Sequence, residues 1–293
     1  MTIQWYPGHI AKAERELKEQ LKRVDVVLEV RDARIPLSTH HPQTDQWVGN
    51  KTRVLVINRV DMIDPRMRQL WESWFQQQGD IPYFTNAQQG KGIRAVAKAA
   101  QTAGEEINQR RRSRGMRPRP VRAVVIGFPN VGKSALINRL LGRRVVESAR
   151  RPGVTRQLRW IRISDQLELL DAPGVIPAKL NNQQQALKLA ICDDIGEASY
   201  DNQRVATALV AFLKDLDNMK EYTLLLKSSL EKRYQLDPNP LTAEDYLHGL
   251  ADYRYQGNIE RTARQLLGDF RKGLLGTIAL EVPPEVLPLV PPM

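Results

Sequence analysis

The chain has 293 residues, 42% of them hydrophobic, which is enough to bury a substantial core in about two domains. It contains no apolar run long enough for a membrane helix, and its start lacks the apolar stretch of a signal peptide, so we expect a cytoplasmic location. A single cysteine, Cys192, excludes an internal disulfide and a metal site built from cysteines alone.

The positive charge is concentrated in one part of the chain. Lys and Arg number 44 against 33 Asp and Glu, a net charge of +11. From Gln109 to Arg162 there are fifteen Arg and one Lys against the single acid Glu147, a net +15, so the rest of the chain nets −4. Such a block predicts a polyanionic partner, with RNA and DNA the leading candidates. A solvated linker with basic flanks is the alternative.

Short β-branched runs alternate with helical stretches along the first half of the chain. This alternation predicts an α/β fold with a doubly wound, mostly parallel sheet and helices on both faces. A further hairpin is expected from two runs that follow. The runs are Val24–Val30, Arg53–Ile57, Ile81–Phe84 and Val121–Ile126, and those of the hairpin are Leu158–Ile163 and Leu167–Leu170.

Residues 109–120, with the sequence QRRRSRGMRPRP, predict a flexible basic connector that is neither helix nor strand. From residue 181 the strand pattern disappears, and apolar residues at helical spacing predict a smaller all-α domain over 181–275. The end, 276–293, is rich in proline and is expected to be a mobile extended tail. The expected helices are Asn202–Leu216, Glu221–Tyr234, Ala243–Tyr253 and Asn258–Leu275, the last with an apolar face of Ile259, Ala263, Leu266, Phe270 and Leu274.

The segment Gly127–Ser134, GFPNVGKS, is a complete phosphate loop between a strand and a helix. Its glycines let backbone N–H groups face the phosphates of a nucleotide, Lys133 supplies a cation to the β- and γ-phosphate oxygens, and the Ser134 hydroxyl binds Mg²⁺. The predicted nucleotide-binding residues here are Asn130, Val131, Gly132, Lys133, Ser134 and Ala135.

The segment Asn58-Arg59-Val60-Asp61 follows a hydrophobic run and matches the guanine-reading pattern Asn-Lys-x-Asp except at Arg59. An Asp carboxylate accepts the N1–H and N2–H of guanine, whereas adenine has no donors there. The expected use of Arg59 is to lay its apolar stem over the base. Asn-x-x-Asp is also common in ordinary turns, but together with a phosphate loop it predicts a guanine site.

Three further segments agree with a guanine nucleotide. Asp171-Ala-Pro-Gly174 resembles the element in which the Asp holds Mg²⁺ and the Gly N–H touches the γ-phosphate. Thr155 lies between this element and the phosphate loop and is expected to give Mg²⁺ a second hydroxyl. Thr85-Asn86-Ala87 resembles the loop whose backbone N–H supports the guanine oxygen, with an ordinary turn as the alternative.

The order of these elements is unusual, because the two that read the base precede the phosphate loop. Joining the old ends of a GTPase and cutting elsewhere produces this order, since termini commonly lie close together. With the opening WYPGH, the segment Asp32–Pro36 and the motifs PNVGKS, PGVT and DAPG, the chain resembles the ribosome biogenesis GTPase A family of circularly permuted GTPases. The motifs cover residues 1–180, which would form the GTPase domain.

The resemblance implies a GTPase that binds a late precursor of the large ribosomal subunit, contacts its rRNA and leaves when GTP is hydrolysed. It also implies an RNA-binding helical domain, although the cations there alternate with acids and fit a solvated helix face equally well. Ras-like enzymes orient the attacking water with a glutamine after Asp-x-x-Gly, but Val175 stands here. In the resembled family His9 would take this role, with a structural or RNA-contacting histidine as the alternative.

The resemblance further implies that Asn130 helps to hold a K⁺ ion beside the phosphates, an ordinary turn asparagine being the alternative. Catalysis would then rest on His9, Lys133, Thr155 and Gly174. Two other function classes remain open: a nucleotide-dependent RNA-binding scaffold with incidental hydrolysis, and an ATPase or small-molecule kinase. The last leaves Asn58 and Asp61 unexplained.

Overall fold

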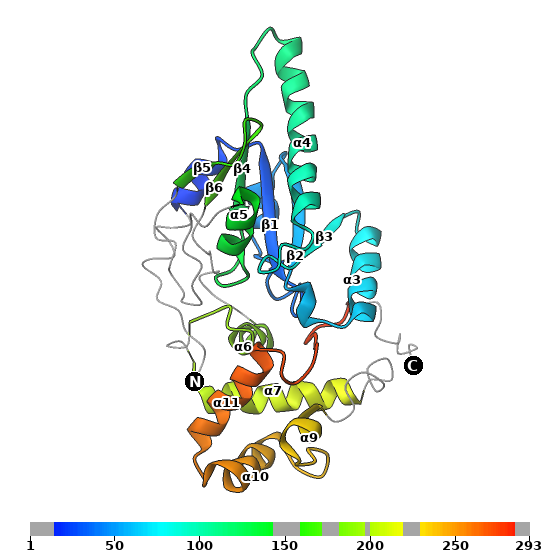
Figure 1. Ribbon diagram of the computed structural model, residues 1–293, viewed down its shortest axis with the longest axis vertical. Coiled ribbons are helices and arrows are strands. Elements are labelled where there is room, and N and C mark those ends of the chain that lie inside the picture. Colours follow the sequence, from blue (N-terminus) through cyan, green and yellow to red (C-terminus); the bar gives the residue numbers. More distant parts are fainter. Residues whose placement is uncertain (1–14, 143–158, 172–181, 197–199, 219–228, 285–293) are drawn as a thin grey trace.

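The computed structural model describes residues 15–142, 159–171, 182–196, 200–218 and 229–284. A six-stranded sheet lies above a group of helices (Figure 1). The strand order is β3-β2-β1-β4-β6-β5, and every pairing is parallel except that between β5 and β6. The strands are β1 (Val26–Asp32), β2 (Thr52–Asn58), β3 (Pro82–Thr85), β4 (Val121–Ile126), β5 (Arg159–Arg162) and β6 (Leu167–Asp171).

Both faces of the sheet are covered, as the continuous apolar runs of its strands predict. Along β1, Leu28 belongs to the core under α4 (Ile93–Ser113), whereas the neighbouring Val27 packs with Leu17 of helix 15–21 and with Trp47 on the opposite face. The predicted doubly wound sheet and the β5–β6 hairpin are therefore confirmed. The other helices of this part are α2 (Thr44–Val48), α3 (Pro65–Gln77), α5 (Lys133–Leu141) and the short 3₁₀ helix η1 (Val60–Met62).

The second half of the described chain is helical, as expected. Four of its helices, α6, α7, α10 and α11, begin at side chains that accept backbone N–H groups, such as Asp201 before α7 and Asn258 before α11. Ala263, Leu266 and Phe270 of the predicted apolar face are buried. The helices are α6 (Gln183–Ile191), α7 (Asn202–Asp217), α9 (Ser229–Tyr234), α10 (Ala243–Tyr255) and α11 (Ile259–Arg271).

Two expectations about where helices end are wrong. Residues 109–113 are not part of a connector but the last turns of α4, which continues to Ser113. Leu274 lies beyond the end of α11 and is 49% exposed. Arg has a high helix propensity, so an arginine run extends a helix until Gly115 stops it with a φ of 69°.

The predicted mobile tail is also wrong for residues 276–281. Ile278, Ala279 and Leu280 are buried, and the Leu280 N–H donates to the Arg34 carbonyl at 2.9 Å. The Glu281 carboxylate accepts the backbone N–H groups of Leu37 at 2.8 Å and Ser38 at 3.2 Å. The chain therefore returns from α11 to the carboxyl ends of the strands.

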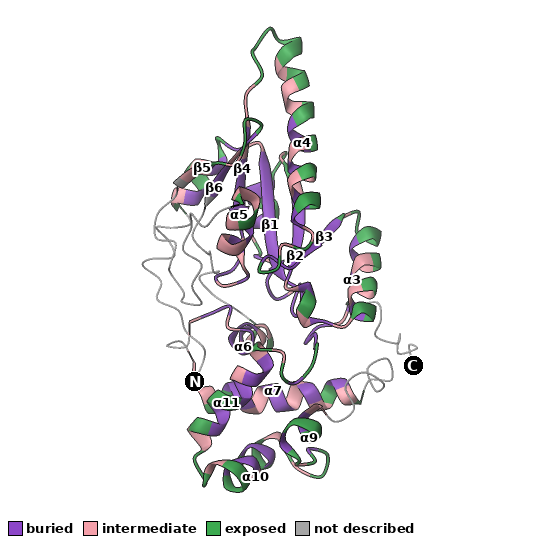
Figure 2. Cartoon of the chain, in the orientation of Figure 1, coloured by how far each residue is buried: buried purple, intermediate pink, exposed green. Residues whose placement is uncertain are grey.

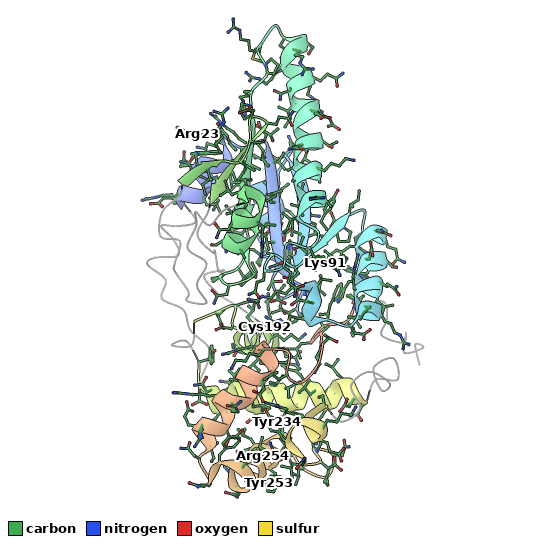
Figure 3. All side chains as sticks on the ribbon, viewed as in Figure 1. Arg23, Lys91, Cys192, Tyr234, Tyr253 and Arg254 are labelled. Atoms are coloured by element: carbon green, nitrogen blue, oxygen red, sulfur yellow. The ribbon has the colours of Figure 1, made fainter. Side chains whose placement is uncertain are left out.

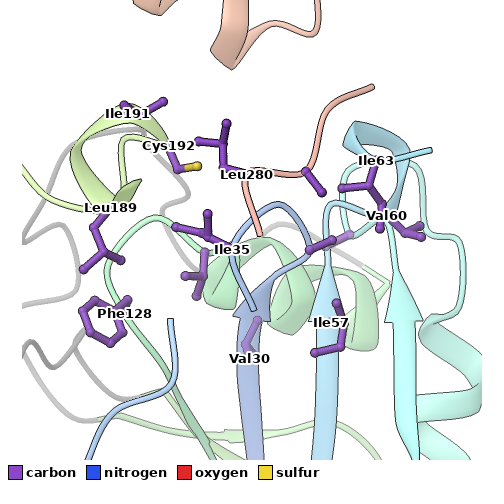
Figure 4. Close-up of a cluster of buried hydrophobic side chains, with 14 of the residues drawn as sticks. Val30, Ile35, Ile57, Val60, Ile63, Phe128, Leu189, Ile191, Cys192 and Leu280 are labelled. Atoms are coloured by element: carbon purple, nitrogen blue, oxygen red, sulfur yellow. The ribbon is translucent and has the colours of Figure 1, made fainter. Parts of the chain in front are cut away.

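One hydrophobic core continues from the sheet into the helices (Figure 4). At the junction, Ile35 and Phe128 lie with Leu189 and Ile191 of α6 and with Leu280. Figure 2 shows the same continuity, with buried residues on the strands and on the facing sides of α6, α7 and α11. No helix in the described part of the chain is both long enough and apolar enough to cross a membrane.

Candidate nucleotide-binding site

The loop between β4 and α5 has a backbone that only glycine allows at two points. Gly127 has a φ of 149°, and a Cβ there would lie 2.4 Å from the Val30 carbonyl oxygen. Gly132 has a φ of 104°, and a Cβ there would lie 2.1 Å from Asn58 Nδ2. No side chain caps α5, which begins directly after Gly132. The first N–H groups of α5 are thus left to bind an anion such as a phosphate.

The Lys133 side chain folds back over this loop. Its Nζ donates to the Phe128 carbonyl at 2.7 Å and to the Gly127 carbonyl at 3.2 Å, and the residue is buried. Ser134 follows on α5 and is half-buried, as is Ala135. A cation and a hydroxyl therefore stand at the same loop, the arrangement that a phosphate–Mg²⁺ group requires.

Asn58, at the carboxyl end of β2, joins three segments that are distant in the sequence. Its Nδ2 donates to the Val131 carbonyl of the phosphate loop at 2.8 Å. Its Oδ1 accepts the Thr85 hydroxyl at 3.0 Å and the Ala87 N–H at 3.0 Å. The structure thus gives this residue of the guanine-reading motif a positioning function, because it holds the phosphate loop against the loop after β3.

The loop Thr85-Asn86-Ala87 was expected to support the guanine oxygen with a backbone N–H, and in the structure the Ala87 N–H donates to Asn58. The loop is held firmly on both sides. The buried Asn86 accepts the Gln89 N–H at its Oδ1, and the Ala87 carbonyl accepts from Arg139 of α5 at 3.1 Å. Asp61, by contrast, lies exposed in η1, and its carboxylate accepts no hydrogen bond from the described residues. Its oxygens are available to a base.

Arg59 lies where the guanine pattern has lysine, and its guanidinium is directed away from solvent. Its Nη1 lies 2.8 Å from Asp32 Oδ2, and its Nη2 donates to the Asn130 carbonyl at 2.5 Å. Nη1 also donates to the Cys192 carbonyl at 3.4 Å. The charged end of Arg59 therefore binds the phosphate loop and the end of α6, a use that the sequence did not indicate.

Around Arg59 lies a buried cluster of charges. Asp32 is fully buried and pairs with Arg34 at 2.7 Å. Burial alone would raise the pKa of Asp32, but Arg34 and Arg59 outweigh it and lower this pKa. Asp194, at 3.8 Å from Arg59, is also fully buried and its carboxylate accepts no hydrogen bond from the described residues. Burial and the nearby Asp32 charge raise the pKa of Asp194 well above its ordinary value.

The phosphate loop touches the helical half of the chain directly. Asn130 Nδ2 donates to the Asp193 carbonyl at 2.7 Å, just after α6. Arg59, Asn130 and Asp193 all have a left-handed backbone, with φ of 63°, 57° and 65°. Figure 3 shows the neighbouring Cys192 at this junction, between the sheet and the helices. Three segments with a costly conformation thus meet at the nucleotide site.

Several predicted site residues lie outside the described part of the structure: His9, Thr155 and Gly174. Asp171 is the last residue of β6, where its backbone pairs with Val125 of the phosphate-loop strand. The backbone therefore brings the Asp171 position to the same edge of the sheet as the phosphate loop, while its side chain is not described.

Sequence reasoning did not identify a second cluster of buried charges, which is centred on Glu29. Glu29 on β1 is buried and binds Arg31 at 2.8 Å and His40 Nδ1 at 2.8 Å. Burial alone would raise the pKa of Glu29, but the Arg31 charge and hydrogen bonds from His40 and Arg31 lower it to about 2. The alternation of Glu29 and Arg31 inside an apolar strand was the available signal, since buried charges are almost always paired.

These features define a class. A phosphate loop on the central strand β4, with the guanine-reading segment on β2 and its supporting loop on β3, both earlier in the chain, is a circularly permuted P-loop GTPase. Residues 122–236 match the family model described as 50S ribosome-binding GTPase.

The chain belongs to the ribosome biogenesis GTPase A family. It is 36% identical to ribosome biogenesis GTPase A of Bacillus cereus, over 97% of this chain and 95% of that protein. It is 30% identical to mitochondrial ribosome-associated GTPase 1 of Xenopus tropicalis, over 94% of each chain. The crystal structure of GNP-bound YlqF from T. maritima shares the fold, with a TM-score of 0.62 at 21% identity, covering 93% of this chain and 99% of that one. The protein is thus a guanine-nucleotide-binding GTP hydrolase of ribosome assembly.

Proposed function

We propose that the protein binds precursors of the large ribosomal subunit and hydrolyses GTP to drive a late assembly step and its own release. The observation that carries this proposal is the contact of the phosphate loop with the end of α6 through Arg59 and Asn130. Because the nucleotide site and the helices share these bonds, loss of the γ-phosphate can alter the surface that the helices present. The matching family's description as 50S ribosome-binding supports the choice of subunit. The proposal includes a cytoplasmic location, where ribosomes are assembled.

Hydrolysis in this proposal uses Mg²⁺ held by Ser134, Thr155 and Asp171, which are oxygen ligands of the type that this ion prefers. Ser134 is half-buried at the start of α5, beside Lys133, which fits this use. K⁺ would lie at Asn130. The Asn130 side chain fits, because its Nδ2 is used by Asp193 while its Oδ1 accepts no hydrogen bond from the described residues. Bound cations would neutralise charge that develops on the phosphates.

Sedimentation with large-subunit precursor particles tests the function. The protein should sediment with the particles when a non-hydrolysable GTP analogue is bound and remain in the supernatant with GDP. Particles should also stimulate single-turnover hydrolysis, and His9→Ala should reduce the stimulated rate by about 10- to 10⁴-fold with little change in GTP affinity. Equal sedimentation in both nucleotide states without stimulation would contradict the proposal and favour a scaffold with incidental hydrolysis.

The guanine-reading assignment has its own test. Asp61→Asn should shift preference from GTP toward xanthosine triphosphate, because an amide donor opposes the guanine N1–H but suits the carbonyl at position 2 of xanthine. Equilibrium binding with both nucleotides measures the ratio. An unchanged preference for GTP would remove Asp61 from the base site.

A further inference from the structure

The end of α4 and the return to β4 form a projection that stands out from the molecule. Gly104 of α4 is in contact with β4, since a Cβ there would lie 1.7 Å from Val121 Cγ2. Beyond this point the helix continues for nine residues to Ser113, a length of about 14 Å. Figure 1 shows this segment rising beyond the sheet. We call residues 105–120 the arginine arm.

Hydrogen bonds between the helix and the returning segment hold the arm together. Asn108 and Arg119 exchange two hydrogen bonds across it, Asn108 Nδ2 to the Arg119 carbonyl at 2.9 Å and the Arg119 N–H to Asn108 Oδ1 at 3.1 Å. Arg111 Nε donates to the Arg117 carbonyl at 3.1 Å. Nearer the sheet, Arg119 is fastened to Asp25 at 2.7 Å and 2.8 Å. These bonds hold the returning segment against the helix, so the backbone of the arm keeps its outer arginines at fixed positions.

Beyond Glu106 the arm carries six arginines and no acid. Four of its six arginines are exposed and form no ion pair with the described residues: Arg110, Arg112, Arg114 and Arg117. The arm's acids, Glu105 and Glu106, lie at its base. Met116, 39% exposed, is the large apolar side chain at the tip. Figure 2 shows the end of the arm as exposed throughout.

We propose that the arginine arm is an RNA-anchoring element that binds the phosphates of folded RNA in the ribosomal precursor. Guanidinium groups pair with phosphate oxygens in a bidentate manner, and several of them on one rigid finger can follow a phosphate backbone. A lipid surface is disfavoured, because a membrane-binding helix needs a broad apolar face and the arm offers Met116 alone. A protein interface needs a largely apolar centre, which four neighbouring arginines do not supply.

The arm lies at the opposite end of α4 from the phosphate loop, and no hydrogen bond joins it to Arg59 or Asn130 within the described residues. Its contribution to binding is therefore the same in the GTP and GDP states. The inference rests on the proposed function only in that the precursor supplies the RNA.

The test compares two triple variants with equal loss of charge. The arm variant carries Arg110→Gln, Arg112→Gln and Arg114→Gln. The control carries Arg66→Gln, Arg94→Gln and Lys98→Gln, three exposed cations on α3 and the inner half of α4. Affinity for precursor particles and for a short RNA duplex is measured at several salt concentrations, with basal GTP hydrolysis as a check on folding.

The arm variant should bind both RNA-containing probes about 10- to 100-fold more weakly near 0.1 M salt, with the slope of log affinity against log salt reduced by about 2. For the duplex, the loss should be equal with GDP and with the GTP analogue, and basal hydrolysis should be unchanged. The control should bind like the wild type. Equal binding by the arm variant, or an equal loss in the control, overturns the inference. Vesicles of phosphatidylglycerol and phosphatidylcholine serve as a third probe. If the arm variant loses binding to the vesicles alone and keeps its affinity for RNA, the inference is likewise overturned.

Failure of the inference and failure of the proposed function can be told apart. If the wild type does not bind particles but binds the duplex through the arm, the proposed function fails and the arm stands as an RNA-binding element. A second measurement attaches an iron chelate to the thiol of Met116→Cys. The reagent labels this thiol selectively because Cys192 is buried. Hydroxyl radicals from the tip should cleave the rRNA of a bound particle at a localised site, and absence of cleavage contradicts docking.

Discussion

Two groups of arginines in this chain lie in opposite environments. Arg31, Arg34 and Arg59 surround the ends of β1 and β2, and each is matched by a carboxylate at 2.7 to 2.8 Å. The four exposed arginines of the arm form no ion pair with the described residues. A buried unpaired charge is too costly to keep, whereas an exposed one costs little until a partner arrives. Pairing therefore marks the arginines that hold the fold, whereas the four arginines of the arm remain free to bind a ligand.

The cations of α10 and α11 resemble the paired arginines rather than the unpaired arginines of the arm. Arg271 donates to the carbonyls of Ala190 and Ile191, and Arg264 pairs with Glu260 at 2.8 Å. Arg254 lies over the rings of Tyr234 and Tyr253. These side chains are engaged within the helices, which favours the solvated or structural interpretation of the helical cations over a dedicated RNA surface.

The largest effect is expected at Arg34. Arg34→Met leaves the fully buried Asp32 with Arg59 as its remaining cation and removes the bond to the Cys192 carbonyl, so the free energy of unfolding should fall by about 3–5 kcal/mol. Urea denaturation followed by circular dichroism measures this. A loss below about 1 kcal/mol would mean that this pair does not stabilise the fold.

The pair of Glu29 and Arg31 gives a pH-dependent effect. The pKa of Glu29 is lowered from 4.5 to about 2 in the folded state, so its contribution is fully present above about pH 4.5 and is lost as pH falls through about 2. That contribution is about 3 kcal/mol. Glu29→Gln should therefore be less stable than the wild type at neutral pH, with the difference shrinking between pH 4.5 and 2. A difference that stays constant over this range would contradict the assignment.

Arg59→Lys should have a smaller effect. Lysine keeps the charge near Asp32, but it cannot reach Asp32 and the Asn130 carbonyl with two separate nitrogens, so we expect a loss of about 1–2 kcal/mol. The same urea experiment measures it. If the lysine variant matches the wild type in stability, the bond to the phosphate loop makes no net contribution to the free energy of unfolding of the free protein.

The smallest effect on stability is expected from the arm. The variant with Gln at positions 110, 112 and 114 should unfold within about 0.5 kcal/mol of the wild type, since exposed side chains without partners contribute little. A loss above about 1 kcal/mol would show that these arginines are structural and would remove the contrast between the two groups.

The sequence predicted the boundaries of helices and strands best at the glycines of the phosphate loop and at the ends of strands. Gly127 is required by a close contact with the Val30 carbonyl and Gly132 by one with the Asn58 side chain, so the boundaries of β4 and α5 follow from the motif. The motif also predicted Asn58 as a site residue, but not its bonds to Val131 and Ala87, which depend on how β2, β3 and β4 are arranged in the sheet.

Other parts could not be predicted because the deciding contacts are distant in the chain. Nothing near Arg59 indicates that its partner would be Asp32 rather than solvent. The tail expectation relied on prolines, while Glu281 is held by backbone groups 244 and 243 residues earlier. The arm was expected to be a flexible connector because Gly115 and Pro118 break regular structure, yet the hydrogen bonds from Asn108 and Arg111 order it.

The attachment of Glu281 also has a consequence for biosynthesis. Its carboxylate binds the N–H groups of Leu37 and Ser38, next to the segment that carries Arg34, and Lys188 approaches it at 3.4 Å. During translation the segment with Leu37 and Ser38 emerges first, and this contact cannot form until more than 240 further residues have been made. Contacts of such high sequence separation slow folding. The nascent protein therefore completes the contacts around Leu37 and Ser38 only after residue 281 has been made.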